Sequence, residues 1–316
     1  MQSEHSPVEH REDVISHKLA GMHPVSWQEA LEGKQTLLRL ANPSDEILDA
    51  IQERFSLDDL HIKDIRNPNH PPHFTRMAGE TVHIILRFPI DKKSDEEESL
   101  TTSVSILADK EMVCLIWPEE RHHRFSSKEM VDLTVAECVS RIIHKLVDHL
   151  LQRVYILRED IDEFEDECLA DVSKADLSHL LSMRKELSAL ARLGITNAAV
   201  IEKLKIDETY HSSVVLADAL EHMHRAAALA ESKAEHALNV MQAVQSLLSQ
   251  RLNDVMKFLA VITVVMTPMG IIAGIFGMNF THMEILSHPN GFTLSVWSML
   301  LLAIVLAIIF KVRKWW

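Results

Sequence analysis

The chain has 316 residues, 25% of them charged, and a formal net charge of −14. This length allows one large soluble domain together with membrane helices. The acidic balance argues against nucleic acid as a partner and favours the attraction of cations. The three cysteines, Cys114, Cys138 and Cys168, lack metal-binding or CxxC spacing, so we interpret them as small core residues in a reducing compartment.

Motifs of several large functional classes are absent from the sequence. No GxxxxGK[ST] phosphate loop occurs, and there is no nucleophile elbow, metalloprotease motif or kinase motif set. We therefore expect neither enzyme activity, nor a nucleotide partner, nor an organic cofactor. Residues 1–20 are polar and charged, so we expect no cleavable signal peptide and assign membrane targeting to helices near the C-terminus.

The hydrophobic pattern is weak over about the first 40 residues. Residues 1–20 are interpreted as a flexible lead, and Trp27 and residues 37–40 as short strands. Ser44, followed by two acids, predicts a side-chain-capped helix start.

That helix is expected to run to about Phe55, and a second short helix should cover about residues 57–65. The proline-rich run Asn67–Pro72 then breaks the chain.

Three runs rich in Val, Ile and Thr follow, and they predict strands at residues 82–88, 100–107 and 112–117. The charged tract at residues 91–98 is interpreted as a solvated hairpin loop. Residues 1–127 are therefore expected to form a cytosolic α/β domain, with one small sheet and helices packed on it.

From about residue 128 the apolar residues recur at helical spacing. Helices are predicted at residues 135–169 and 176–192, and together they make residues 128–205 an antiparallel helical hairpin. From about Tyr210 onward no residue breaks the helical pattern until Pro268.

A single helix of about 70 residues would be about 105 Å long. A rod of that length is improbable without partners, so we expect self-association into a bundle. Residues 206–257 would be the stalk portion of this helix, on the cytosolic side of the membrane.

Residues 258–276 carry no charge over about 19 positions, which is long enough to span a bilayer. We predict the first transmembrane helix at residues 258–279. Small or polar residues recur on one of its faces, as expected in a pore wall or a tight helix pair. With the turn before it, this face carries Asn253, Met256, Leu259, Thr263, Thr267, Gly270 and Gly274.

The second apolar segment, residues 292–310, is more uniformly hydrophobic and is expected to face lipid. A short loop, residues 280–291, joins the two helices, and residues 311–316 form a basic tail. Because basic residues precede the first helix and follow the second, both termini are expected in the cytoplasm and the loop outside.

The tripeptide Gly277-Met278-Asn279 stands at the end of the first of these two helices. The flanking NDVMKFL and IAGIFGMNF runs, Pro268 and the basic-aromatic C-terminus accompany it. Together these features resemble the CorA family of divalent-cation channels, closely from about residue 210 to the end and more loosely before it.

The resemblance implies a CorA-like homopentameric funnel in the cell (inner) membrane. It implies a passive channel for Mg²⁺, with Co²⁺ and Ni²⁺ as further candidate ions, in which five Asn279 amides select hydrated ions at the external mouth. Gly277 and Met278 would shape the turn that holds Asn279. Asn253 would form a polar ring, and Met256 and Leu259 an apolar constriction in the cytosolic neck.

The resemblance also implies a regulatory Mg²⁺ site between neighbouring subunits. Asp218 falls on the stalk position where the family has a cation-binding Asp, Glu221 can assist it, and Glu80 best matches the partner acid. Mg²⁺ is thus both the transported ion and the regulator. The sequence departs from the family at residues 283–286, which read MEIL where MPEL is usual, and at Gln242, where an acid is frequent.

Two alternatives stay open at this point: a zinc transporter of the same fold, with or without proton coupling, and a non-conducting membrane-tethered coiled-coil scaffold. The 19 histidines invite the zinc hypothesis. His222 and His224 are two positions apart and cannot share one helix face. Because no HxxxH pair with a third ligand occurs, we expect no dedicated zinc site.

Overall fold

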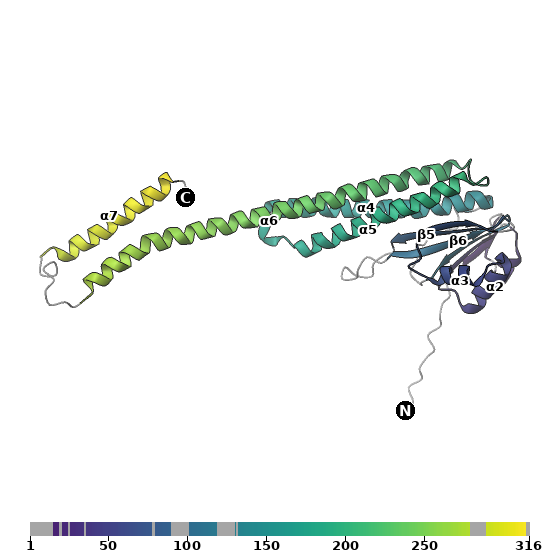
Figure 1. Ribbon diagram of the computed structural model, residues 1–316, viewed down its shortest axis with the longest axis horizontal. Helices are drawn as coiled ribbons and strands as arrows, with labels where there is room; N and C mark the ends of the chain where they lie inside the picture. The colour runs from purple at the N-terminus through teal and green to yellow at the C-terminus, as the bar shows by residue number, and fades with distance from the viewer. Residues whose placement is uncertain are drawn as a thin grey trace, which may run out of the picture. The chain divides into compact units, whose positions relative to one another are not determined.

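A computed structural model describes residues 15–18, 21–24, 26–34, 36–77, 80–89, 101–118, 130, 132–278 and 289–313 (Figure 1). The chain divides into two compact units. The first comprises Met1–Asp166 and Asp176–Asn239, and the second comprises Glu167–Ala175 and Val240–Trp316.

The first unit contains a mixed sheet in which seven strands are described, in the order β2-β1-β3-β7-β6-β5-β4. Strands β3 and β7 pair in parallel and the other neighbours are antiparallel. The central strands are buried on both faces, which explains their nearly continuous apolar runs. The bounds are β1 Ile15–Lys18, β2 Gly21–Pro24, β3 Thr36–Ala41, β4 His73–Arg76, β5 Val82–Pro89, β6 Thr101–Ala108 and β7 Met112–Trp117.

Three short helices, α1 (Trp27–Glu32), α2 (Asp45–Phe55) and α3 (Asp59–Arg66), contribute to one hydrophobic core with the sheet. Figure 1 shows α2 and α3 against the sheet. The apolar residues of α2 recur every three or four positions, so one stripe of the helix is buried against the strands. This core includes Ile47, Ile51, Phe55, Leu38, Leu40 and Ile116.

Long helices complete the first unit, which contains most of α4 (Val135–Ala170), α5 (Leu177–Ile206) and the first part of α6, which begins at Val214. A short 3₁₀ turn at Val172–Lys174, between α4 and α5, belongs to the second unit together with the last residues of α4. Within this unit α4, α5 and the first part of α6 lie side by side (Figure 1). The fully buried Asn197 of α5 accepts a hydrogen bond from Arg87 N at 3.0 Å and donates one to Arg87 O at 2.6 Å, and so anchors α5 to β5.

Helices α5 and α6 approach each other closely at Gly194. A Cβ atom added there would lie 2.7 Å from the Ala227 Cβ, too close for any side chain without a shift. The alanine-rich start of α6 therefore both favours the helix and permits tight packing.

The second unit contains the remainder of α6, from Val240 to Phe276, and α7 (Gly291–Val312). Both helices are long and apolar enough to cross a membrane. Most of their large apolar side chains are exposed in the single chain, including Phe258, Ile271 and Leu301.

Several sequence predictions are confirmed. The helix after Ser44, the second short helix, the three central strands, the first helix of the hairpin and the two apolar helices all form within a few residues of their predicted bounds. The α/β fold followed by a long helix and two apolar C-terminal helices is therefore correct. The three cysteines are buried and free, and burial raises the pKa of the Cys138 thiol to about 12.

Three local predictions are wrong at the N-terminal end, and two strands were not predicted. Trp27 begins a helix rather than a strand, because Ser26 and Glu29 form a reciprocal capping box. Ser44 precedes α2 without a side-chain cap. Part of the predicted flexible lead is strand β1. The two strands that the sequence did not predict are β2 and β4, the second of which begins directly after the proline-rich run.

Two helix bounds also differ from prediction. Helix α5 extends to Ile206 rather than ending near Arg192, because Gly194 is used for close packing and does not end the helix. Helix α6 starts at Val214 because Tyr210 lies in a turn and the Ser213 hydroxyl accepts from Leu216 N at 3.2 Å. The charged tract at residues 91–98 lies outside the described residues.

Candidate functional site

The first candidate site is the small and polar face of α6 within its apolar segment. Because α6 is continuous through Pro268 to Phe276, the predicted positions stay on one helix face. Every one of them is exposed in the single chain. Methyl groups added at Gly270 or Gly274 would meet no atom of the described chain within 4 Å, so this face is open to a partner or to a pore.

Thr263 lies in the middle of this face. Its hydroxyl donates to Leu259 O of its own helix at 2.9 Å. Such a bond satisfies the hydroxyl hydrogen locally and leaves the oxygen lone pairs available to a neighbour. Asn253, Met256 and Leu259 lie on the turns before it and are exposed.

Helix α6 ends at the predicted tripeptide. Gly277 N donates to Ala273 O at 2.9 Å, and Met278 N donates to Ile275 O at 3.3 Å. Asn279 and the loop containing residues 283–286 lie outside the described residues. The chain therefore reaches the motif as an exposed helix end, with Gly277 and Met278 both exposed.

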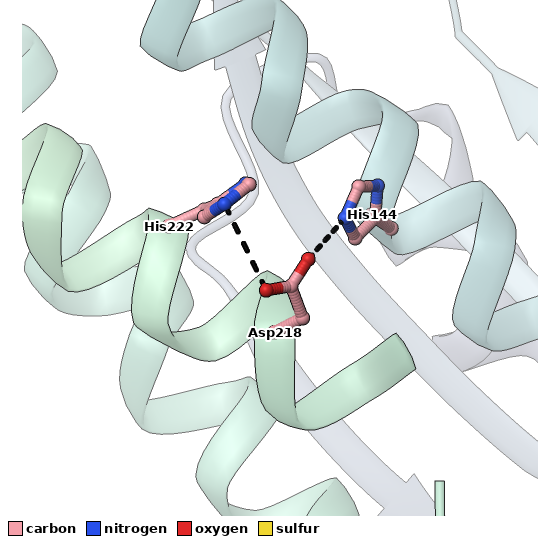
Figure 2. Close-up of side chains that lie close together, drawn as sticks. All are labelled: His144, Asp218 and His222. Carbon is pink, nitrogen blue, oxygen red and sulfur yellow. Dashed lines mark hydrogen bonds and ion pairs between the residues drawn. The ribbon is translucent and has the colours of Figure 1, made fainter. Parts of the chain in front are cut away.

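The second candidate site surrounds Asp218, near the start of α6. Figure 2 shows that Asp218 points between His222 of the same helix and His144 of α4. The His144 Nε2 lies 2.7 Å from Asp218 Oδ2, and the His222 Nε2 lies 3.8 Å from Asp218 Oδ1. One nitrogen or oxygen atom from each of these three residues lies within 4.8 Å of the other two, so the group could hold a metal ion.

Asp148 of α4 completes this group from the other side. Its two carboxylate oxygens each lie 3.0 Å from the Nδ1 atom of one histidine, His144 or His222. The pKa of the Asp218 carboxyl is lowered chiefly by its hydrogen bond to His144, which outweighs the opposing effect of burial. Two carboxylates and two imidazoles thus alternate around one small space between α4 and α6.

Comparison with known proteins decides the family. The sequence profile of the CorA-like Mg²⁺ transporter protein family matches residues 35–314, which is most of the chain. The chain belongs to this family.

Relatives of the CorA-like chain agree with this assignment. The cobalt/magnesium transport protein CorA of Thermotoga maritima is 23% identical over 283 residues, covering 85% of this chain and 80% of the relative. The complete structure of the CorA magnesium transporter from Methanocaldococcus jannaschii superposes with a TM-score of 0.75 at 18% identity, covering 94% of this chain and 97% of the other. The ZntB cytoplasmic domain from Vibrio parahaemolyticus matches with a TM-score of 0.60 at 13% identity, covering 75% and 98%, and shows the fold alone.

The other two acids predicted for a regulatory site have separate neighbours in the CorA-like chain. Glu80 has a left-handed backbone with φ of 70° and forms an ion pair with Lys110 at 2.8 Å. Glu221 pairs with Arg225 one turn along α6 at 2.7 Å. Among the described residues, no hydrogen bond or ion pair joins Glu80, Glu221 and Asp218, so an interfacial site remains a prediction.

Sequence reasoning missed the grouping of histidines around Asp218. It compared His222 with His224, whereas His224 instead faces Glu202 of α5 at 3.3 Å. The expectation of no dedicated zinc site is not tested by this geometry, but the sequence argument for it did not consider this group of side chains. The available signal was two His/Asp pairs at i, i+4 spacing, His144–Asp148 and Asp218–His222. His122, His123, His282 and His288 lie outside the described residues.

Proposed function

We propose that this CorA-like chain is the subunit of a passive divalent-cation channel, not an enzyme, and that it carries Mg²⁺, with Co²⁺ and Ni²⁺ as further candidate ions. The observation that carries the proposal is the sequence Gly277-Met278-Asn279 at the end of an apolar helix whose small-residue face is open. The names of the family and of the Thermotoga maritima relative support the same ion class.

The proposed assembly is a homopentamer with α6 around the axis and α7 toward lipid. Gly270 and Gly274 would let backbones approach closely, and Met256 and Leu259 would form an apolar constriction that closes by dewetting. Residues 258–279 and 292–310 are the proposed membrane segments of each copy.

Selectivity is proposed to come from a ring of Asn279 amides at the external mouth. Mg²⁺ gives up its waters reluctantly, so amide oxygens that hydrogen-bond those waters can select the hydrated ion without stripping it. A membrane potential of 100 mV supplies about 4.6 kcal/mol for a divalent cation, at about 2.3 kcal/mol per charge. Inward flux therefore needs no nucleotide.

The proposed location is the cell (inner) membrane, and the proposed topology places both termini in the cytoplasm. Arg251 and Lys257 precede the first membrane segment, and Lys311 and Arg313 follow the second. This distribution supports an external loop at residues 280–291 and a cytosolic basic tail at residues 311–316.

Regulation is proposed to occur through Mg²⁺ held between subunits by Asp218, Glu221 and Glu80. Facing carboxylates repel each other unless a cation neutralises them. Bound Mg²⁺ would then favour a closed, symmetric arrangement, and its loss would release it. The support from the single chain is that Asp218 and Glu221 are exposed on α6.

The deciding experiment reconstitutes the full chain in liposomes and measures uptake of Mg²⁺, Co²⁺, Ni²⁺ and Zn²⁺ separately. Asn279→Ala should abolish divalent uptake while the oligomer stays intact, because the amide ring is lost and the helices are not. Asn239→Ala, an exposed asparagine on the same helix, is the matched control and should transport normally. Unchanged uptake in Asn279→Ala would remove the selectivity claim, and faster flux of Zn²⁺ than Mg²⁺ would favour the zinc alternative.

Regulation is tested by proteolysis of the purified oligomer with and without Mg²⁺. Mg²⁺ should protect the wild type, and Asp218→Lys should lose most of that protection because a cationic side chain replaces a ligand. Glu235→Lys, an exposed acid elsewhere on α6, should behave as wild type. Identical cleavage of wild type and Asp218→Lys under both conditions would end the feedback proposal.

A further inference from the structure

The group between α4 and α6 is built from two matching pairs. His144 and Asp148 are four residues apart on α4, and Asp218 and His222 are four residues apart on α6. Residues at this spacing lie on one helix face. Each helix therefore presents one imidazole and one carboxylate to the other, and Figure 2 shows three of these side chains pointing to a common place.

The two imidazole rings are oriented alike by Asp148. This carboxylate contacts the Nδ1 atoms of both His144 and His222 at 3.0 Å, through a different oxygen for each. A neutral imidazole has one N–H and one lone pair. In the metal-free chain the His144 Nε2 donates to Asp218 Oδ2 at 2.7 Å. A bound cation would take the place of that Nε2 hydrogen, and with both Nδ1–H groups donating to Asp148 both Nε2 lone pairs would then be directed toward the ion.

We infer that His144, His222 and Asp218 form a binding site for a borderline transition-metal cation, of the class of Zn²⁺, Co²⁺ and Ni²⁺, within one chain. Two imidazole nitrogens and one carboxylate, with a position left for water, suit these ions. Mg²⁺ prefers oxygen ligands in octahedral geometry and is poorly served by two imidazoles. Asp148 acts from behind, because a carboxylate on the far nitrogen fixes the ring and raises its basicity as a ligand.

The present spacing needs only small adjustments to accept an ion: His144 Nε2 and Asp218 Oδ2, now 2.7 Å apart, must separate slightly, and His222 Nε2 and Asp218 Oδ1, now 3.8 Å apart, must approach slightly. The three ligand atoms lie within 4.8 Å of one another, and tetrahedral Zn²⁺ at its usual bond lengths places neighbouring ligands about 3.4 Å apart. The two histidine side chains are 24% exposed and that of Asp218 is 49% exposed. Solvent ions can therefore reach the site, and the Asp218 side chain can rotate toward the rings.

This site differs from the proposed interfacial Mg²⁺ site in its donors and in its origin. All its ligands come from one chain, and the histidines belong to it alone. Asp218 is common to both sites, so variants of the histidines and of Asp148 separate the two proposals. A bound ion would also cross-link α4 to α6 and stabilise the first unit by mass action.

The test measures Zn²⁺ binding by calorimetry, and Co²⁺ binding by visible absorption, on the untagged full-length protein in detergent with excess Mg²⁺ present. Wild type should bind one Zn²⁺ per chain at this site. The His144→Gln/His222→Gln double variant should lose that binding, and Asp148→Asn should weaken it by about 10–100-fold because only the supporting carboxylate is changed. His236→Gln is the matched control, because His236 pairs with Glu165 of α4 at 3.0 Å across the same two helices, and it should bind as wild type.

Circular dichroism establishes that each variant is folded. If the double variant does not fold, the His222→Gln single variant and Asp148→Asn decide the result. Wild-type Zn²⁺ affinity in these histidine and Asp148 variants, or displacement of Zn²⁺ by equimolar Mg²⁺, would overturn the inference. Asn279→Ala protein should retain full Zn²⁺ binding, so a failure of the channel proposal and a failure of this site give different results.

Discussion

The two parts of helix α6 differ sharply in what surrounds them. From Val214 to Val244 the helix repeatedly buries small or apolar residues, such as Ala219, Met223 and Ala230. After Val244, from Gln245 to its described end at Phe276, it buries none. One continuous helix therefore has two parts. Its upper part, residues 214–244, packs against its own chain, and its lower part, residues 245–276, is left to contact lipid, other copies or water.

The residue types of the two parts explain this difference in packing. The upper part uses alanine at closely spaced positions, which suits contact with α5 at Gly194. The lower part has bulky β-branched residues on one face and Gly270, Gly274 and threonines on the other. Small residues with no neighbour in the chain are expected where helices of other copies approach.

The largest effect is expected from a bulky side chain on the small-residue face of the lower part of α6. Such a side chain tests directly whether that face contacts other copies. In Gly274→Leu the larger side chain should keep the helices of neighbouring copies apart. The pentamer fraction, and uptake with it, should fall at least about tenfold, because a loss of about 1.4 kcal/mol of association free energy is sufficient for that. Native mass spectrometry and liposome flux measure the two quantities.

Ile271→Leu, which keeps the volume at an exposed apolar position, is the control and should assemble normally. A fully assembled, fully active Gly274→Leu protein would show that this face meets neither another copy nor a pore.

The next effect concerns an ion pair that the first unit completes by itself. Asp207, whose side chain is 8% exposed, accepts from Arg76 Nε at 2.7 Å and from Thr209 N at 3.0 Å. Burial raises the pKa of the Asp207 carboxyl, but its hydrogen bonds to Arg76 and Thr209 together hold that pKa below its ordinary value. Asp207→Asn should destabilise the first unit by about 2 kcal/mol at neutral pH, less than for a fully buried pair because Arg76 is 36% exposed.

The pH dependence has a definite sign. A carboxyl whose pKa is lowered on folding stabilises the protein above its unfolded pKa, and this contribution disappears as the pH falls through the folded pKa. The stability gap between wild type and Asp207→Asn should therefore close in acid, as followed by thermal melts in detergent. Glu208→Gln, at the adjacent position, should show no such gap, and a gap independent of pH would contradict the assignment.

The smallest expected effect compares two glycines directly. Gly194→Ala should cost about 1–2 kcal/mol, because its Cβ would press on Ala227 and overpacking is expensive. Gly270→Ala adds a methyl group to open space in the single chain and should stabilise helix α6 there by up to about 1 kcal/mol. Thermal melting of monomeric protein in detergent measures both, and equal destabilisation by both variants would erase the contrast between the two parts of the helix.

Much of the fold could be predicted from local sequence patterns. Local sequence was sufficient for the strands at residues 82–88 and 112–117 and for the two apolar helices. Each has a marked apolar pattern or composition, and in the two strands the apolar residues that form the pattern are buried. Trp27 could not be assigned correctly by propensity, because the Ser26–Glu29 capping box decides its conformation. The end of α5 was misplaced because Gly194 is required by a contact with α6, and nothing in the local sequence reveals that contact.

The candidate sites divide in the same way. The open face of α6 follows from helical spacing alone, so the positions from Asn253 to Gly274 could be selected without a structure. The group around Asp218 could not, because His144 is 74 residues away from Asp218 in the sequence. Its assembly depends on α4 and α6 running in the same direction with one particular register, which the lengths of α4, α5 and their connections determine.

The hydrogen bond of Thr263 affects whether the proposed pore would favour cations or anions. Since the hydroxyl hydrogen is committed to Leu259 O, the outward side of this oxygen can only accept. Water molecules held by a metal cation turn their hydrogens away from the ion, whereas those around an anion turn their hydrogens toward it. A ring of such oxygens could therefore accept hydrogen bonds from the waters around a cation, whereas the waters around chloride direct hydrogens toward the ion and match the ring less well. The ring would discriminate in this way within an apolar segment that carries no formal charge.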